Sequence, residues 1–171
     1  LMILATSWMG LVGFIDDYLK AIKKFPKGLV GRYKMFGQIT LGLIIGSILY
    51  FLPEDPSTRS VTTVPFLKNF VVDFNIFYIL VVVLVVTGTS NAVNLTDGLD
   101  GLAIGCTAIS FIAFAAMCYI TGNVKFASYL NIIYIPEAGE LTVYALAMLG
   151  ASLGFLWYNS YPASVFMGDT G

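Results

Sequence analysis

The sequence predicts an all-α polytopic membrane protein with five membrane-spanning helices. Of its 171 residues, 58% are hydrophobic and only 11% are charged, and the mean hydropathy is +0.85. A soluble domain carries about 25% charged residues, so this composition excludes an ordinary soluble fold. Apolar stretches also recur at lengths close to the ~20 residues with which a helix crosses a bilayer. None of them shows the alternation of a membrane β-barrel strand.

The stretches that we predict to be spans are residues 1–15, 35–52, 76–93, 102–121 and 141–158. We expect one transmembrane domain over residues 1–171, as a fragment of a longer protein that is incomplete at both ends. The outer connection, residues 53–73, contains a run rich in threonine and valine from Ser57 to Val64, which favours a short β-hairpin.

Two small-residue patterns, Gly42 with Gly46 and Gly150 with Gly154, are typical of close helix packing in membranes. These patterns are compatible with a homodimer, but we expect the glycines to pack against other helices of the same protomer.

The basic residues predict the orientation in the membrane. Six of the nine Lys and Arg residues fall in the first connection: Lys20, Lys23, Lys24, Lys27, Arg32 and Lys34. The positive-inside rule places this connection in the cytoplasm. Alternation of the spans then puts residues 94–101 and 159–171 on the same side. The carboxylates that share this side are Asp16, Asp17, Asp97, Asp100 and Asp169. The positive-inside rule does not explain why acidic residues gather there.

Asp16 and Asp17 follow the first stretch and lie about 100° apart on a helix. Lys20 stands four residues after Asp16 and three after Asp17, and both spacings favour an ion pair. Two interpretations are open at this point. The pair is either a solvated helix end with a salt bridge, or a carboxylate pair that acts as a base or beside a metal ion.

The second cluster lies in the run from Asn91 to Gly101, where the third span ends. Its bland interpretation is a polar turn before a helix, because Thr96, Asp97 and Asp100 all suit a helix N-terminus. A carboxylate beside the hydrocarbon region of the membrane is energetically unfavourable, however, and this cost favours a role in binding a ligand or a metal ion. Asp169, in the last cluster, is a turn residue if it is considered alone.

Carboxylates beside a lysine cluster suit a divalent cation with phosphate ligands. Mg²⁺ takes one or two protein carboxylates and completes its shell with water and phosphate oxygens. A membrane enzyme that joins a lipid phosphate to a nucleotide-activated group needs this combination. Cys106 and Cys118, with no histidine in the chain, exclude a Cys/His zinc site and a disulfide framework. We expect no nucleic-acid partner.

Three ordered motifs resemble a known family. They are Gly13-Phe14-Ile15-Asp16-Asp17-Tyr18-Leu19-Lys20, the run Asn91-Ala-Val-Asn-Leu-Thr-Asp-Gly-Leu-Asp-Gly-Leu-Ala103, and Phe166-Met167-Gly168-Asp169-Thr170-Gly171. The chain is similar in them to the phospho-N-acetylmuramoyl-pentapeptide transferases, which belong to the polyprenyl-phosphate hexosamine-phosphate transferases.

The resemblance implies a ten-helix fold in the bacterial inner membrane, with its active site at the cytoplasmic face. It implies Mg²⁺-dependent transfer of phospho-MurNAc-pentapeptide from UDP-MurNAc-pentapeptide to undecaprenyl phosphate. The products would be UMP and the first lipid-linked peptidoglycan precursor.

The resemblance also implies roles for individual residues. Asp169 matches the family's magnesium ligand, and Asp16 matches the residue proposed to deprotonate the lipid phosphate. The other catalytic matches are Asp17, Asp97, Asp100 and Lys20. The substrate-binding matches are Asn94, Gly98, Leu99, Asp100, Asn159, Phe166 and, more loosely, Lys34. The family's histidine-rich loop has no counterpart in this chain, so we expect the 171 residues to be inactive alone.

Three other functions stay open at this point. A sister enzyme would transfer GlcNAc-phosphate to the same lipid, whereas a cation transporter would carry charge near the middle of its spans. A non-catalytic assembly protein would leave the gathering of carboxylates unexplained.

Overall fold

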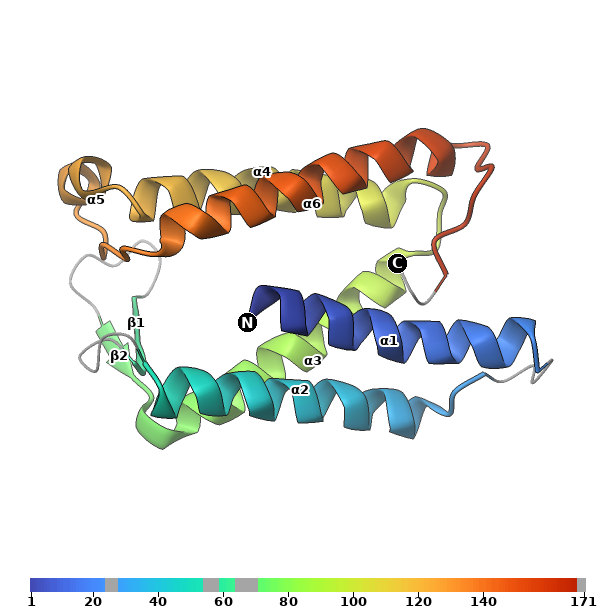
Figure 1. Ribbon diagram of the computed structural model, residues 1–171, viewed down its shortest axis with the longest axis horizontal. Coiled ribbons are helices and arrows are strands. Elements are labelled where there is room, and N and C mark those ends of the chain that lie inside the picture. The colour runs from blue at the N-terminus through green and yellow to red at the C-terminus, as the bar shows by residue number, and fades with distance from the viewer. Residues whose placement is uncertain (24–27, 54–58, 64–70, 169–171) are drawn as a thin grey trace. The chain divides into compact units, whose positions relative to one another are not determined.

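The computed structural model describes residues 1–23, 28–53, 59–63 and 71–168 (Figure 1). Its elements are α1 (Met2–Ala21), α2 (Gly31–Phe51), β1 (Val61–Thr63), β2 (Val71–Asp73), a 3-10 turn (Asn75–Phe77), α3 (Tyr78–Thr96), α4 (Leu102–Thr121), α5 (Val124–Leu130) and α6 (Ala138–Asn159). The chain divides into two compact units, which are described separately. Unit 1 comprises Leu1–Asn94 with Gly168–Gly171, and unit 2 comprises Leu95–Met167.

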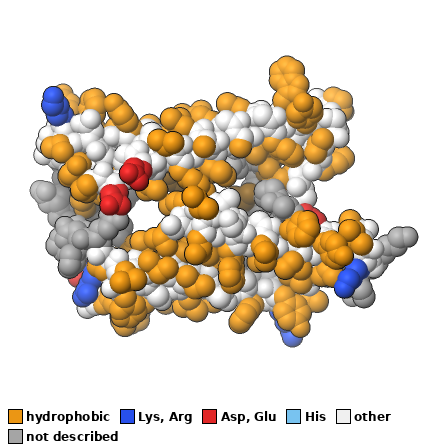
Figure 2. Space-filling view, in the orientation of Figure 1, with side chains coloured by type: hydrophobic (Ala, Val, Ile, Leu, Met, Phe, Trp, Pro, Cys, Tyr) orange, Lys and Arg blue, Asp and Glu red, His pale blue; other side chains and the backbone are white. Residues whose placement is uncertain are grey.

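The predicted all-α membrane architecture is confirmed. Within the described residues, four helical segments are long and apolar enough to cross a membrane: Gly31–Phe51, Asn75–Thr96, Leu102–Thr121 and Ala138–Asn159. The first predicted stretch is also a helix, α1, but it continues through the charged residues Asp16, Asp17 and Lys20. It is therefore not counted among these four. Hydrophobic side chains cover most of the surface seen in Figure 2, as expected of helices that face lipid.

The helices extend beyond the apolar stretches that predict them. The third span was predicted to end at residue 93, but α3 continues to Thr96, and α2 already begins at Gly31, before the predicted residue 35. Polar residues at a membrane surface can continue the helical hydrogen bonding of the apolar segment, so hydropathy marks the hydrocarbon region rather than the end of the helix.

In unit 1, α2 and α3 are antiparallel neighbours. Near one end the Gln38 amide donates to Ser90 Oγ (3.0 Å), and at the other end Tyr50 Oη donates to Asn75 Oδ1 (2.9 Å). Between them two glycines allow close approach. A Cβ added at Gly42 would lie 2.8 Å from Val83 Cα, and one at Gly46 would lie 3.2 Å from Ile79 Cα. Packing within the protomer is therefore confirmed for the first small-residue pattern.

The second small-residue pattern behaves differently. Among the described residues, no atom lies within 4 Å of a Cβ added at Gly150 or Gly154, so packing of this pattern within the protomer stays a prediction. The difference between the two patterns provides a matched pair of substitutions.

We predict that Gly42→Ala lowers the free energy of unfolding of the full-length protein by about 1–3 kcal/mol, because the new methyl group meets the α3 backbone. Gly150→Ala should be neutral or stabilising by up to ~1 kcal/mol, because alanine favours a helix and meets nothing here. Thermal unfolding of both variants in detergent checks this. Equal destabilisation by the two substitutions would contradict the packing of Gly42 against Val83.

The β-hairpin predicted in the outer connection is confirmed as β1 and β2, which pair antiparallel with Thr62 opposite Val72. Ser60 Oγ donates to Asp73 Oδ1 at 2.5 Å, and the Asn75 N–H donates to the same oxygen at 2.9 Å. These hydrogen bonds lower the pKa of Asp73 from its ordinary value, and the bond from Ser60 has the largest effect. The hairpin is thereby attached to the start of α3.

In unit 2, α4 and α6 lie side by side along their length (Figure 1). At one end a Cβ at Gly122 would lie 2.8 Å from Gly139 Cα, and at the other end Gly101 contacts Asn159. The short helix α5 was not predicted. Its signal was Asn123, whose side chain accepts hydrogen bonds from the N–H groups of Lys125 (3.0 Å) and Phe126 (3.5 Å) as an N-cap does.

Candidate active site

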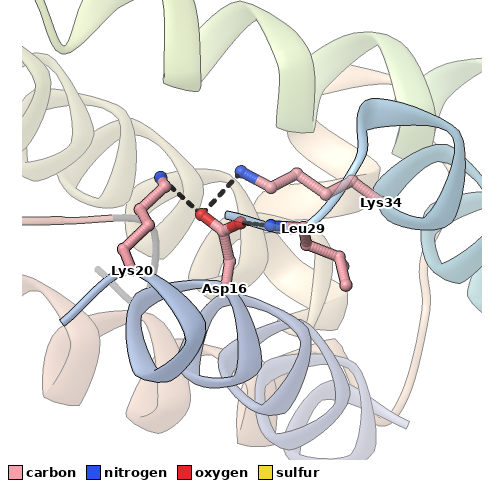
Figure 3. Close-up of polar contacts among 4 residues, drawn as sticks. All are labelled: Asp16, Lys20, Leu29 and Lys34. Carbon is pink, nitrogen blue, oxygen red and sulfur yellow. Dashed lines mark hydrogen bonds and ion pairs between the residues drawn. The ribbon is translucent and has the colours of Figure 1, made fainter. Parts of the chain in front are cut away.

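Asp16 lies at the centre of a charged cluster near the end of α1 (Figure 3). Its Oδ2 lies 2.5 Å from Lys20 Nζ and 3.0 Å from Lys34 Nζ, while its Oδ1 accepts the Leu29 N–H at 2.5 Å. The Asp16 side chain is 0% exposed. A buried carboxylate is costly unless charged and hydrogen-bonding partners surround it, and these groups provide such partners. The predicted ion pair between Asp16 and Lys20 is confirmed.

Gly28 closes this cluster from the side of the first connection. Its φ is +55°, and a Cβ at this position would lie 2.6 Å from both Asp16 Oδ1 and Lys20 Cε. Both the left-handed backbone and the close approach require a residue without a side chain. Sequence reasoning missed Gly28 and the Leu29 N–H, because no motif marks them.

Asp17 contacts a different segment of unit 1. A Cβ at Gly168, whose φ is +63°, would lie 3.0 Å from Asp17 Oδ2 and 3.4 Å from Oδ1. The Asp17 carboxylate is therefore next to the backbone of the residue that precedes Asp169 in the sequence. Asp169 itself lies outside the described residues. The first and third acidic motifs thus meet at Asp17 and Gly168, which are 151 positions apart.

In unit 2 the side chain of Asn159 joins two loops at the C-terminal end of α6. Its Oδ1 accepts the Gly101 N–H at 3.0 Å, and its Nδ2 donates to the Val165 carbonyl at 2.9 Å. Asn159 is 4% exposed. The amide therefore connects the turn before α4 with the segment that carries Phe166.

Asp100 adds a second connection between the same two loops, because its Oδ2 accepts the Ala163 N–H at 3.2 Å. The following residue, Gly101, has a φ of +76° and begins α4 as its N-cap. A polar turn followed by a helix start is thus confirmed in the second cluster. The glycine permits the left-handed turn that directs Asp100 and the Gly101 N–H to these partners.

Several predicted substrate-binding residues are exposed beside these connections. Phe166 is 75% exposed and Leu99 is 70% exposed. Asp97 and Gly98, in the same turn as Leu99, are exposed as well. Because Asn159 bonds to Gly101 and Val165, it brings the Leu99 turn and the Phe166 segment to one end of unit 2. An aromatic face and a backbone turn are available there for a planar ligand.

The predicted site residues are distributed over both units. Unit 1 contains Asp16, Asp17, Lys20, Lys34 and Asn94, and unit 2 contains Asp97, Gly98, Leu99, Asp100, Asn159 and Phe166. Within each unit the predicted groups gather at helix ends. That the five carboxylates line one common cleft stays a prediction.

Sequence reasoning also missed a polar layer inside unit 1. Gln38, which is 6% exposed, donates to Ser90 Oγ at 3.0 Å and accepts from Asn91 Nδ2 at 3.0 Å. Its signal was a lone amide inside the apolar stretch of residues 35–52. The hydrogen bonds satisfy the buried amide and fix the register of α2 against α3.

Few described side chains could bind the predicted Mg²⁺ ion. Among the described residues, no group of three or more His, Cys, Asp or Glu side chains could hold a metal ion. The donors that fit Mg²⁺ are hard carboxylate oxygens, of which it takes one or two. The Asp17 carboxylate offers such oxygens beside Gly168, the residue that precedes Asp169 in the sequence, and the magnesium site stays a prediction.

We predict that Asn159→Ala destabilises the full-length protein by about 1–3 kcal/mol for each backbone group that loses its partner. The Gly101 N–H and the Val165 carbonyl would both be left without the amide. Ser160→Ala is the matched control, since Ser160 is exposed and next to Asn159. Thermal unfolding of the two variants measures the effect. A melting temperature equal to that of Ser160→Ala would contradict the bridging role.

The apolar helices and the carboxylates, amides and lysines at their ends define the class: an α-helical polytopic membrane protein with its polar chemistry at helix termini. The model of glycosyl transferase family 4 matches residues 1–171. The chain therefore belongs to glycosyl transferase family 4.

Several curated relatives align with the entire chain. It is 58% identical to the phospho-N-acetylmuramoyl-pentapeptide-transferase of Chloroherpeton thalassium over 171 residues, which are 100% of this chain and 46% of that protein. The proteins of the same name from Thermodesulfovibrio yellowstonii and Chlorobium chlorochromatii are 54% and 51% identical over 171 residues, 100% of this chain and 47% and 46% of theirs. The chain thus spans just under half the length of these relatives.

Proposed function

We propose that the full-length protein containing this chain transfers phospho-MurNAc-pentapeptide from UDP-MurNAc-pentapeptide to undecaprenyl phosphate and releases UMP. The observation that carries this proposal is the identity of 58% over all 171 residues to a relative named for the reaction. We place the reaction at the cytoplasmic face of the bacterial plasma membrane, because most of the basic residues fall in the first connection.

The reaction exchanges one phosphoanhydride (P–O–P) linkage for another. An oxygen of the lipid phosphate forms a bond to the phosphorus that carries the sugar. The bond from this phosphorus to the oxygen that bridges to the uridine phosphate breaks, and UMP leaves with that oxygen. Both reactants are anions, so the protein must position them and neutralise their charge. The Lys20 and Lys34 ammonium groups are suited to this, because both lie at the Asp16 carboxylate and their side chains are 42% and 26% exposed.

The exposed groups of unit 2 suit the nucleotide. The ring of Phe166 offers a face on which uracil can stack, and stacking on aromatic side chains is a common way to bind a base. The turn of Gly98 and Leu99 offers backbone groups, while Asn159 and Asp100 hold the turn in place. In this assignment Asn159 supports the pocket from behind.

Mg²⁺ is the proposed cofactor, with Asp169 as its ligand and Asp17 as the neighbouring carboxylate. When bound, the ion would neutralise negative charge on the oxygens of the reacting phosphate groups. We propose Asn94 and Asp97 as further polar groups that contact the substrates.

A competition assay tests the substrate. The full-length protein, in liposomes that contain undecaprenyl phosphate, is incubated with equal concentrations of UDP-MurNAc-pentapeptide and UDP-GlcNAc. The lipid products are then separated and identified by mass spectrometry. We expect the muramoyl product and an equal amount of UMP. A GlcNAc-phosphate lipid would assign the sister activity instead. No lipid product, together with cation flux across the membrane, would favour a transporter.

A further inference from the structure

We propose that Gln38 is a positioning residue, whose buried amide holds the end of α3, and with it Asn94, in the orientation that the substrates require. The inference deepens the proposed function and rests on it, because Asn94 is one of the residues that we propose to contact the substrates. Its starting observation is an amide side chain that is 6% exposed, lies inside a membrane-spanning helix and belongs to none of the three acidic motifs.

The Gln38 amide binds two consecutive residues of α3. Its Nε2 donates to Ser90 Oγ and its Oε1 accepts from Asn91 Nδ2, both at 3.0 Å. Consecutive residues project from a helix about 100° apart, so a rotation of α3, or a slide by one residue, would break both hydrogen bonds. A buried amide without partners is unfavourable, so each alternative register of the two helices costs free energy. Gln38 therefore fixes both the rotation of α3 and its height in the membrane.

Helix packing alone does not require an amide at this place. Elsewhere along the helix pair, α2 and α3 already meet at Gly42, where an added Cβ would lie 2.8 Å from Val83 Cα, and at the far end Tyr50 binds the residue that begins the 3-10 turn before α3. Apolar contacts favour close approach, whereas a single polar residue in a helix interface can specify one register at a cost in stability. Gln38 lies at the end of the interface from which α3 continues to Asn94.

Asn91 connects Gln38 to Asn94. Its Nδ2 also donates to the Thr87 carbonyl at 2.8 Å, so the Asn91 amide is held by both helices. Asn94 is exposed and follows three residues later on α3, and residues three apart are neighbours on a helix surface. When the position of Asn91 is fixed, the direction in which Asn94 projects from the helix is fixed with it.

The residue before Gln38 attaches α1 to the same part of α2. The indole Nε1 of Trp8 donates to the Gly37 carbonyl at 3.1 Å, and a Cβ added at Gly37 would lie 3.1 Å from Val12 Cγ2. Gly37 and Gln38 thus hold α1 and α3, the two helices in which the first and second acidic motifs begin. The side chain of Gln38 bonds to α3, so Gln38 acts on substrate through that helix.

Two variants of the full-length protein distinguish positioning from simple attachment of the helices. Gln38→Met keeps the length of the side chain but removes both hydrogen bonds, whereas Tyr50→Phe removes a hydrogen bond at the far end of the same helix pair. We expect Gln38→Met to lower kcat by about tenfold without changing the pH at which the rate is half-maximal, because it displaces a substrate contact and changes no ionisable group. Tyr50→Phe should retain kcat even if its melting temperature falls. A wild-type kcat in Gln38→Met, or an equal loss of kcat in Tyr50→Phe, would overturn the inference.

A double-mutant cycle tests whether Gln38 acts through Asn91. We expect Gln38→Met and Asn91→Leu each to lower kcat, and the double variant to lie within about threefold of the slower single variant, because residues of one network do not act additively. Combining Gln38→Met with Thr40→Val is the control, since the Thr40 hydroxyl donates to the Phe36 carbonyl of its own helix, and this second change should leave kcat as it is in Gln38→Met. Multiplied effects of Gln38→Met and Asn91→Leu would overturn the inference.

A measurement without substrate separates this inference from the proposed function. Spin labels are attached to Arg32→Cys on α2 and Val93→Cys on α3, two exposed positions, in a cysteine-free background, and their dipolar coupling gives the distribution of distances between them. We expect a single narrow distribution that Gln38→Met shifts or broadens and Tyr50→Phe leaves unchanged. Protein that behaves in this way but transfers nothing would refute the proposed function alone. A distribution that Gln38→Met does not change would overturn the positioning role even if transfer persists.

Discussion

Asp169→Asn in the full-length protein is expected to lower Mg²⁺-dependent transfer by about a thousandfold or more. The amide keeps the shape of the side chain but removes the charge that would hold the metal ion against the substrate phosphates, and a bound metal ion contributes several kcal/mol to such a reaction. A thousandfold loss corresponds to about 4 kcal/mol at the ~1.4 kcal/mol that each tenfold change requires. Initial rates of UMP release across a range of Mg²⁺ concentrations measure the effect.

The control for this variant is Glu140→Gln, which removes an exposed carboxylate from the first turn of α6, at the end opposite Asn159. It should retain the wild-type rate, and both variants should unfold at the wild-type temperature. Undiminished turnover of Asp169→Asn at ordinary Mg²⁺ would show that Asp169 is only a turn residue. The contact between Asp17 and Gly168 would then be structural.

Phe166→Ala should weaken binding of UMP and of the UDP-sugar by roughly tenfold to a hundredfold while the lipid phosphate binds as before. Base stacking on an aromatic ring contributes about 1–3 kcal/mol in nucleic-acid sites. At ~1.4 kcal/mol for each factor of ten, this energy gives the expected range. Phe166 is 75% exposed and packs little against its own chain, so its loss should change affinity more than stability.

Separate titrations of UMP and of the lipid substrate distinguish the roles of Phe166. Trp157→Ala is the control, because Trp157 is an 81% exposed aromatic residue on α6. It should leave UMP affinity unchanged. Equal losses for both ligands in Phe166→Ala would mean that the ring supports the fold, and unchanged UMP affinity would remove it from the uridine pocket.

The sequence predicted the structural features that depend on interactions between residues close together in the chain. Hydropathy located the helices, and the spacing of Asp16 and Lys20 predicted their ion pair, since residues four apart on a helix lie one above the other. The hairpin followed from a run of β-forming residues. The cap at Asn123, which begins α5, was also local and could have been recognised.

Other features depend on tertiary contacts and could not be predicted. Lys34 joins Asp16 because α2 packs beside α1, and Gly28 must be a glycine because Asp16 and Lys20 lie against it. The sequence alone predicts that Asn159 is a polar cap at the end of a span. In the structure its side chain accepts a hydrogen bond from the N–H of Gly101, 58 positions away. Such roles arise only when two loops meet, and no period or spacing in one segment encodes them.

From the alternation of the spans we predict that the polar helix ends of both units face the cytoplasm, as a shared site would require. The most direct test of this prediction is the sidedness of single cysteines in the full-length protein, after Cys106 and Cys118 are replaced by alanine. Tyr33→Cys in unit 1 and Leu99→Cys in unit 2 test exposed positions, 66% and 70% exposed. Thr62→Cys in the hairpin is the control for the outer face.

A membrane-impermeant thiol reagent is applied to right-side-out and inverted vesicles. We expect Tyr33→Cys and Leu99→Cys to react only in inverted vesicles and Thr62→Cys only in right-side-out vesicles. UMP with Mg²⁺ should slow the labelling of Leu99→Cys. Reaction of Tyr33→Cys and Leu99→Cys from opposite sides would place the two polar surfaces across the membrane from each other and contradict a shared site.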